Sequence, residues 1–323
     1  TRGEGAAADV ALLLPLRPDV RVCDEEAVPG DVQVREATAE QREAYRDAIA
    51  KSFKAADKLD ADAMNAVVKM VEVAQERLLG RFQREIGRGF WAPHYLPKFR
   101  AAIDELVDDL AKKYRRDINE FLPKAWDVGL ATTDAAIKGS GLGLSVHHID
   151  PRTAGMAVGV DGSLITGMAR DGKKYLGRLV GQHILTSEGP GRLMQTLASD
   201  PQTEVGNPWR SVAYRGQIIA RTELSFVAGG ATQARMEQYA GKFPDVGLKK
   251  RLLVAHVGEW PCPICEEHEG VVYEVDEGPA TPLHPNCRCH YISIVPGLES
   301  AAPNNRLVPK LLDASVAEGV LHR

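Results

Sequence analysis

The stretch MNAVVKMVEVAQERLLGRFQREIG, residues 64–87, has the clearest periodicity in this chain and decides its fold class. Apolar residues recur in it every three or four positions, which is typical of a helix that buries one face. The glycines that follow predict its end near residue 87, and Asp60 or Asp62 is expected to cap its start. The apolar positions of this stripe are Met64, Val67, Val68, Val71, Ala74, Leu78, Phe82 and Ile86.

The same spacing continues on both sides of this stretch. Tyr45, Ile49 and Phe53 recur at four-residue intervals before it, and a third stripe runs from Phe99 to Phe121 after it. Pro97 suits the first turn of that third helix, and Pro123 is expected to kink or end it. Two or three long amphipathic helices with short connections predict an antiparallel bundle, which we place at residues 36–138. The proline-rich residues 1–35 are expected to form an extended arm.

A glycine-rich segment, residues 139–163, follows the bundle. The spacing and the lysine of a phosphate-binding loop are absent from it, so it is expected to be a hinge or a connection. Helical periodicity then returns in three segments, residues 164–182, 191–199 and 209–239.

The composition changes after residue 250. Runs of β-branched and aromatic residues predict three strands, at 251–257, 271–275 and 290–295. The last residues, 298–323, are expected to form a tail with a short helix near 307–316. The predicted fold class is therefore α+β, mainly α, with a long-helix bundle first and a small β module near the C-terminus.

Composition excludes several classes of protein. The chain has 323 residues, 44% hydrophobic and 26% charged, which allows a sizeable core and excludes collagen-like and wholly disordered chains. Its net charge of −4 excludes a wholly basic nucleic-acid binder. No apolar run approaches the length of a transmembrane helix. The first residue is Thr1, so we expect a processed product or a part of a longer chain.

The charge is unevenly distributed. Residues 170–251 contain 13 basic and 7 acidic side chains, a balance of +6 within a chain of −4. Solvated helical faces would explain this, and so would a surface for DNA phosphates or for an acidic protein. The candidates for contact with DNA or a partner are Lys173, Lys174, Arg178, Arg210, Arg215 and Arg235.

Four of the five cysteines lie close together, in Cys262-Pro-Ile-Cys265 and Cys287-Arg-Cys289. A Cys-x-x-Cys turn directs two thiolates to one side and makes half of a tetrahedral zinc site. Cys287 and Cys289 are two residues apart, so on a strand they face the same way and complete a four-cysteine site. The next alternative has His284 in place of one of them. The sequence thus predicts one structural Zn²⁺, with Cys262, Cys265, Cys287, Cys289 and His284 as candidate ligands.

Other interpretations of the cluster stay open. Disulfides would suit a chain that lives outside cells, whereas a redox-active Cys-x-x-Cys would need a βαβ context instead of the strands predicted here. A zinc-dependent hydrolase or deaminase would need an open metal position and a general base such as Glu266 or Glu267. The upstream His-x-Glu of the deaminases is missing, and the chain is not expected to be an enzyme. His268 and His290 are weaker ligand candidates.

Two blocks of residues carry a family resemblance. The first is Ile219-Ala-Arg221-Thr222-Glu223 with the helix that follows it, and the second is Trp260 and Cys262-x-x-Cys265 followed by His284-Pro-Asn-Cys287-Arg-Cys289. Over about residues 140–295 the chain resembles the MuF-like minor head proteins of tailed bacteriophages, the phage head morphogenesis family. We place this domain at residues 139–297.

The resemblance implies a structural protein of the virion. Such a protein would associate with the portal protein and the major capsid protein, in the head interior or at the portal vertex, after assembly in the host cytoplasm. It would assist head assembly and DNA packaging or ejection, with double-stranded DNA as a further contact and no membrane. The alternative is a zinc-containing protein that binds DNA directly.

The Arg-Thr-Glu block also carries an expectation of its own. An Arg and a Glu two residues apart on a helix do not face each other, so each needs a partner elsewhere. We expect Arg221 and Glu223, with Arg288, to form a structural network that ties this helix to the cysteine-bearing sheet.

Overall fold

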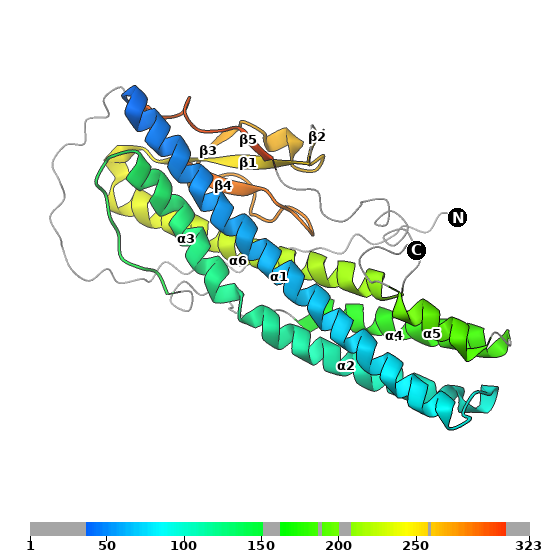
Figure 1. Cartoon of the computed structure of the whole chain (residues 1–323). Helices are drawn as coiled ribbons and strands as arrows, with labels where there is room; N and C mark the ends of the chain where they lie inside the picture. Colours follow the sequence, from blue (N-terminus) through cyan, green and yellow to red (C-terminus); the bar gives the residue numbers. More distant parts are fainter. Residues whose placement is uncertain (1–36, 151–161, 187–188, 200–207, 258–259, 308–323) are drawn as a thin grey trace, which may run out of the picture. The chain divides into compact units, whose positions relative to one another are not determined.

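The computed structural model describes residues 37–150, 162–186, 189–199, 208–257 and 260–307 (Figure 1). Long helices dominate these residues, and a five-stranded sheet occupies the C-terminal part. The predicted class, α+β and mainly α, is therefore confirmed. The expected arm at 1–35 lies outside the described residues. So does nearly all of the helix expected near 307–316.

The first helix is longer than its sequence pattern predicts. α1 spans Ala39–Gly87, 49 residues, and begins at a capping box in which Thr38 and Gln41 bond each other's backbone. The predicted start at Asp60 or Asp62 is wrong, because the chain passes through both residues as a helix. The residues around them include neither Gly nor Pro, and Asp in a helix interior costs less than about 1 kcal/mol, which packing readily offsets.

The proline positions are predicted correctly. After a short 3-10 turn, η1 (Pro93–Tyr95), α2 spans Leu96–Asn119 with Pro97 in its first turn. α3 spans Leu122–Gly139 and has Pro123 in its first turn. Because the first backbone N–H groups of a helix have no partner within it, proline costs little there. Pro123 thus marks the end of one helix and the start of the next.

The later helices agree with the predicted segments to within a few residues. They are α4 (Gly162–Leu185), α5 (Pro190–Ala198) and α6 (Pro208–Lys242). α6 packs against α1, α3 and α4, and α2 packs against α1 and α4. The shared core includes five fully buried aromatic side chains, Phe82, Phe99, Tyr114, Trp126 and Trp209.

One glycine determines how closely two of these helices approach. A Cβ atom at Gly129 of α3 would lie 2.2 Å from the carbonyl oxygen of Ala228 on α6, so no larger residue fits there without a shift. Because α3 ends at the predicted boundary and α6 lies beyond it, the helices of the predicted bundle and those of the predicted head domain share one core. The boundary at 138/139 stays a prediction, and the described residues belong to a single compact unit.

The sheet is built around one long strand. β1 (Lys249–Val257) pairs antiparallel with β2 (Trp260–Pro261), β3 (Val272–Glu274) and β4 (His290–Ile294), and parallel with β5 (Asn305–Leu307). The three predicted strands are present. β2 and β5 were missed because strands of two or three residues are too short to show alternation. At Leu307, the expected start of a helix is a strand. Two further 3-10 turns, η2 (Pro244–Val246) and η3 (Glu266–His268), complete the described elements.

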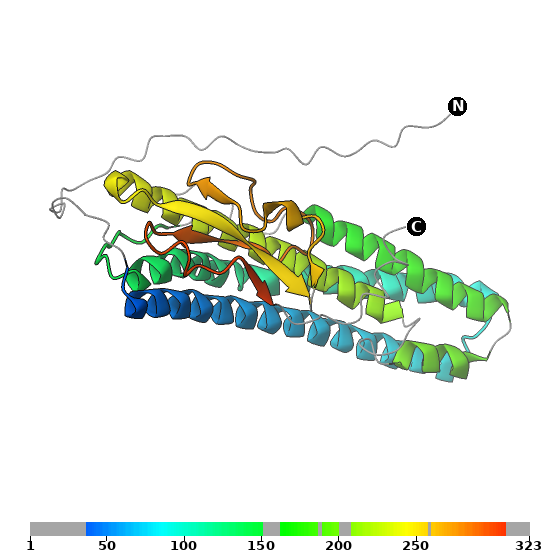
Figure 2. The ribbon, with the colours of Figure 1, turned by 90° about the horizontal axis from the view of Figure 1, so that it is seen from above.

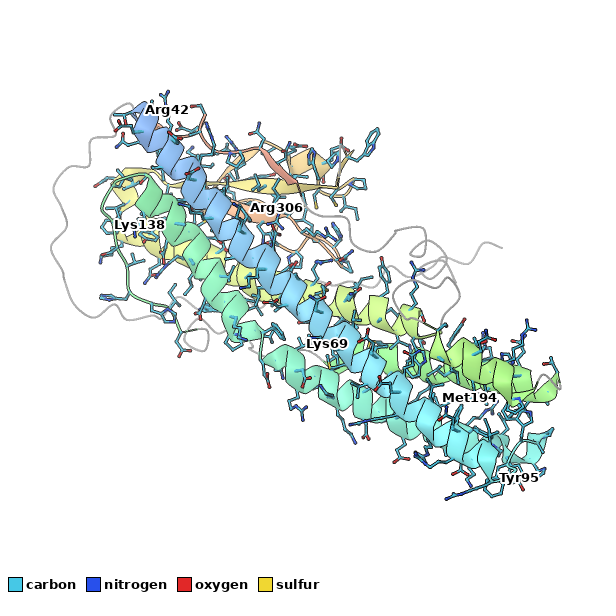
Figure 3. All side chains as sticks on the ribbon, in the orientation of Figure 1. Arg42, Lys69, Tyr95, Lys138, Met194 and Arg306 are labelled. Carbon is cyan, nitrogen blue, oxygen red and sulfur yellow. The ribbon has the colours of Figure 1, made fainter. Side chains whose placement is uncertain are left out.

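The sheet lies across α3 and α6, and β4 contacts both helices (Figure 2). The N-terminal half of α1 also reaches it. The Tyr45 hydroxyl donates to the carbonyl oxygen of Ser293, and Arg306 of β5 lies against α1 (Figure 3). None of the described helices is long and apolar enough to span a membrane.

Candidate metal centre

The four clustered cysteines and His284 converge beside β1. Their ligand atoms form two groups, within each of which every pair lies within 4.8 Å, and Cys265 belongs to both. The Sγ atoms of Cys265 and Cys287 are 3.8 Å apart, and Nε2 of His284 is 3.0 Å from Sγ of Cys262. None of the four cysteines is in a disulfide, so the disulfide alternative does not describe this structure. The groups are Cys262, Cys265 and His284, and Cys265, Cys287 and Cys289.

Two tight turns present the ligands. In the first, the backbone N–H of Cys265 donates to the carbonyl oxygen of Cys262 at 3.0 Å. In the second, Cys287 donates in the same way to His284 at 3.1 Å. The second turn includes Asn286 with φ of 65°, a left-handed conformation that asparagine tolerates better than most residues. Each turn therefore brings two donor side chains to one side of the chain.

The cluster occupies a gap in the edge of the sheet. β4 pairs with β1 only as far as Leu253, and β2 pairs with it from His256 onward. Between them, the N–H of Ala255 donates to Sγ of Cys289 at 3.3 Å, and its carbonyl oxygen accepts from Cys262 at 3.1 Å. Because the two polar groups of a strand residue point to the same edge, the cysteines replace the missing ladder partner.

These residues fit a tetrahedral metal ion. With zinc–sulfur bonds of about 2.3 Å, two ligand sulfur atoms lie about 3.8 Å apart, which matches the Cys265–Cys287 separation. Nδ1 of His284 is 2.8 Å from the carbonyl oxygen of Pro285, which only an N–H can satisfy. In the neutral imidazole, Nε2 then keeps its lone pair and faces the cysteines, and a bound cation would favour this form over the protonated one.

The electrostatics of the cluster favour a thiolate. A hydrogen bond from Cys265 holds the pKa of Cys287 well below the ordinary value of a thiol, and the same bond raises the pKa of Cys265. A hydrogen bond with Cys287 raises the pKa of His284 to about 9. Since metal ions bind cysteine as the thiolate, a site that already favours one is suited to a cation.

The weaker ligand candidates lie outside these groups. His268 bonds the hydroxyl of Tyr273 at 2.8 Å, and burial lowers the pKa of His290 to about 3, beside Phe53. Glu266 and Glu267 belong to neither group. Among the described residues, the metal-binding groups therefore contain no carboxylate that could act as a general base at the metal.

Three residues of α6 hold the second turn. Arg221 is almost fully buried, and its Nη1 donates to Oδ1 of Asn286 at 2.8 Å. The hydroxyl of Thr222 accepts from the backbone N–H of Asn286 at 2.9 Å, and Ser225 donates to the carbonyl oxygen of Cys287 at 3.2 Å. The expected tie between this helix and the cysteine-bearing segment is thus present at Arg221.

The network extends to α1. Nε of Arg221 donates to Asp60 at 3.0 Å, and Arg306 donates to Asp57 at 3.2 Å. Burial, together with the charge of Arg221, lowers the pKa of Arg288 to about 10. Three arginines thus meet two aspartates where α1, α6 and the β module join.

Sequence reasoning missed several members of this network. Asp60 is interpreted from the sequence as a helix cap and Arg306 as part of a tail, and Asn286 is given no role of its own within the motif. Only Asn286 carried a signal, its position between His284 and Cys287. Glu223 is half-buried, and after the larger effect of burial its charge helps to raise the pKa of Tyr114.

The predicted basic surface separates into buried and exposed members. Arg235 is buried and forms two bonds to Asp134, at 2.8 and 2.7 Å, and Arg210 is buried as well. Both are therefore corrected: a guanidinium enclosed between helices is not available to DNA or to a partner. Arg215 pairs with Asp171, and Lys173 pairs with Asp108 at 2.7 Å. Lys174 and Arg178 are exposed.

No protein-family model, no curated protein and no solved structure matches this chain. The resemblance to the MuF-like family therefore rests on the motif residues. The geometry by itself defines a closed cluster of thiols and an imidazole that could hold a metal ion.

Proposed function

We propose that this cluster holds one zinc ion and that the ion is structural. Thiolates with one imidazole in a tetrahedral arrangement are the ligand set of structural zinc sites. Five donors compete for four positions, so no position is left for substrate water. Cys262, Cys265 and Cys287 with either Cys289 or His284 would complete the site. The ion would clip two turns to the edge of β1 and thereby order the whole β module.

We propose further that the chain is a structural minor head protein of a tailed bacteriophage. One observation carries this proposal: the two blocks on which the resemblance rests, 65 residues apart in sequence, are joined through Arg221 and Asn286 at 2.8 Å. Residues that belong to one motif are expected to work together in space. The portal protein and the major capsid protein would be the partners, and the virion head the location.

Direct DNA binding by a zinc-containing protein is the second candidate function. It is favoured by the exposed cations of α4, Lys174 and Arg178, which lie outside the zinc module. The hydrolase and deaminase alternatives have less support, since neither metal-binding group among the described residues includes a carboxylate.

Metal analysis tests the zinc proposal. Purified full-length protein should contain about one zinc per chain by mass spectrometry, and Cys265→Ser, which removes the sulfur shared by both groups, should abolish it. Cys23→Ser is the matched control and should retain the zinc. A native chain with no bound metal would overturn the proposal.

Particle composition tests the head-protein proposal independently. Heads assembled from the phage genome that encodes this chain should contain it after purification. Asn286→Ala, which removes the acceptor of Arg221, should reduce its incorporation, whereas Lys51→Ala on the exposed face of α1 should not. Complete absence of the native chain from purified heads would refute this function while leaving the zinc proposal standing.

A further inference from the structure

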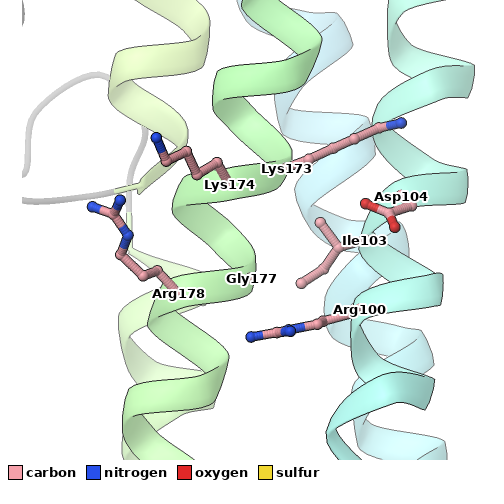
Figure 4. A pocket seen from close by; sticks show the side chains of 7 residues that line it. All are labelled: Arg100, Ile103, Asp104, Lys173, Lys174, Gly177 and Arg178. Carbon is pink, nitrogen blue, oxygen red and sulfur yellow. The ribbon is translucent and has the colours of Figure 1, made fainter.

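A charged hollow lies between α2 and α4, away from the metal centre. It has a volume of about 400 Å³ and is lined by side chains of both helices (Figure 4). Gly177 of α4 leaves room on its floor, since a Cβ atom there would meet nothing nearer than Arg100 at 4.0 Å. The lining residues are Arg100, Ile103, Asp104, Lys173, Lys174, Gly177 and Arg178.

Cations outnumber acids around this hollow. Arg100 projects from α2 toward α4, while Lys174 and Arg178 extend from the other flank of α4, so positive charges stand on both sides (Figure 4). Among the described residues, none of these three side chains forms an ion pair. Lys173, the fourth cation of the lining, differs from them because it forms an ion pair with Asp108. The unneutralised charge is therefore concentrated at Arg100, Lys174 and Arg178.

The chemistry of the lining distinguishes between an anionic polymer and a protein. Ile103 is fully buried, and the exposed lining is formed by charged side chains. Protein–protein interfaces have an apolar centre that is poor in charge, which this hollow lacks. Lysine and arginine without an apolar centre are typical of surfaces that contact phosphates.

The spacing of the cations favours a repeating anion. Lys174 and Arg178 are four residues apart on one helix, which places them about 6 Å from each other along the axis. Arg170 continues the row by one more turn; its side chain is 79% exposed and lies 3.7 Å from the carboxylate of Asp171. A row of cations along a helix, with a further one on the neighbouring helix, matches a backbone of phosphates better than a single small anion.

We propose that the hollow between α2 and α4 binds the phosphate backbone of double-stranded DNA without sequence preference. This inference rests on the proposed function, in which the chain meets packaged DNA. It assigns the contact to Arg100, Lys174 and Arg178, and it excludes the buried Arg210 and Arg235.

Duplex binding at several salt concentrations tests the assignment. The full-length protein is titrated into a fluorescent 30-base-pair duplex of random sequence, and the affinity is measured by anisotropy. The double variant K174E/R178E should bind about tenfold more weakly at 0.1 M salt. Its slope of log affinity against log salt should fall by about 1.8, since each lost phosphate contact removes about 0.9. Arg100→Glu, on the other helix, should lower the slope by about half as much.

The matched control changes the same charge elsewhere. Lys54 and Lys58 are exposed, four residues apart on α1, and form no ion pair among the described residues. K54E/K58E should bind DNA as the native chain does. The milder K174Q/R178Q replaces the charge reversal if that variant loses its helical circular dichroism.

Three results would overturn the assignment: no binding of the native chain, equal losses in both double variants, or an unchanged slope in K174E/R178E. Each is independent of whether the chain is found in phage heads. A failure of this inference is thus distinguishable from a failure of the proposed function.

Discussion

The helical part and the β module are stabilised in different ways. The main buried apolar cluster draws on all six α-helices, and within the described residues it includes no residue of a strand. The β module has one long strand, and its neighbours have only two to five residues each. Such short strands are marginal by themselves. β1 and β4 also bury apolar side chains, among them Leu252, Val254 and Ile292, so the sheet combines burial with the cysteine cluster and with polar contacts to the helices.

The difference between the two regions has a physical reason. A long amphipathic helix buries apolar surface at every turn, at roughly 25 cal/mol per Å². The segment around the first two cysteines buries less, because Trp260 is 78% and Ile264 56% exposed, although Cys265 is fully buried. A metal crosslink would add stability at this segment. The predictions that follow separate the two kinds of stabilisation, from the largest expected effect to the smallest.

Removal of the proposed zinc ion should unfold the β module and spare the helices. Chelation, or Cys265→Ser, should remove hydrogen-exchange protection from residues 249–307, because structural zinc contributes on the order of 10 kcal/mol. Protection in α2 and α3 should persist, since their core does not involve the cysteines. Exchange measured by mass spectrometry checks this. Loss of protection in all regions at once would show that the two parts unfold as one.

A larger side chain in the helical core should destabilise the helical part. Gly129→Ala places a methyl group within 2.2 Å of the carbonyl oxygen of Ala228, so α3 and α6 must separate. The free energy of unfolding in urea should fall by about 3 kcal/mol. Zinc content should stay near one per chain, because Gly129 lies outside both metal-binding groups. A variant as stable as the native chain would show that the two helices are not closely packed there.

Loss of a contact at the junction between the two regions should lower the free energy of unfolding by less. Arg221→Ala leaves Asp60 and Asn286 without their partner, and the free energy of unfolding should fall by about 2 kcal/mol, a value discounted because Asp60 keeps some exposure. A double-mutant cycle with Asp60→Asn should reveal coupling between the two residues. Additive effects would mean that this pair contributes nothing. The exposed Lys58→Ala is the control on α1.

The smallest expected effect is a gain in the free energy of unfolding. Gly80 lies inside α1, and a Cβ atom there would meet only Nη1 of Arg84, at 3.7 Å. Gly80→Ala should therefore raise the free energy of unfolding by about 0.5–1 kcal/mol, because alanine favours the helix more than glycine does. Thermal or urea unfolding of this variant beside Gly129→Ala compares the same substitution in open and in crowded surroundings.

Much of this architecture follows from local patterns. The apolar stripe at Met64–Ile86, the prolines at 97 and 123, and the Cys-x-x-Cys turn act over a few residues, and each appears in the structure as expected. One local expectation was wrong. Asp60 looked like a helix cap, but α1 runs through it and its carboxylate accepts from Arg221 of α6.

Charge was less predictable than hydrophobicity. Arg178 and Arg235 both lie on predicted helices and are both sequence candidates for contact with DNA or a partner. In the structure Arg178 is exposed beside a hollow, whereas Arg235 is buried and pairs with Asp134. Periodicity shows which face of a helix is apolar, because that depends on neighbours three and four residues away. It does not show which acid meets which base, because the partners lie on different helices, as Arg235 and Asp134 do at 101 residues apart, and only packing brings them together. The helices and the cysteine pair are therefore properties of short segments, whereas the Arg221 network and the hollow between α2 and α4 exist only in the folded chain.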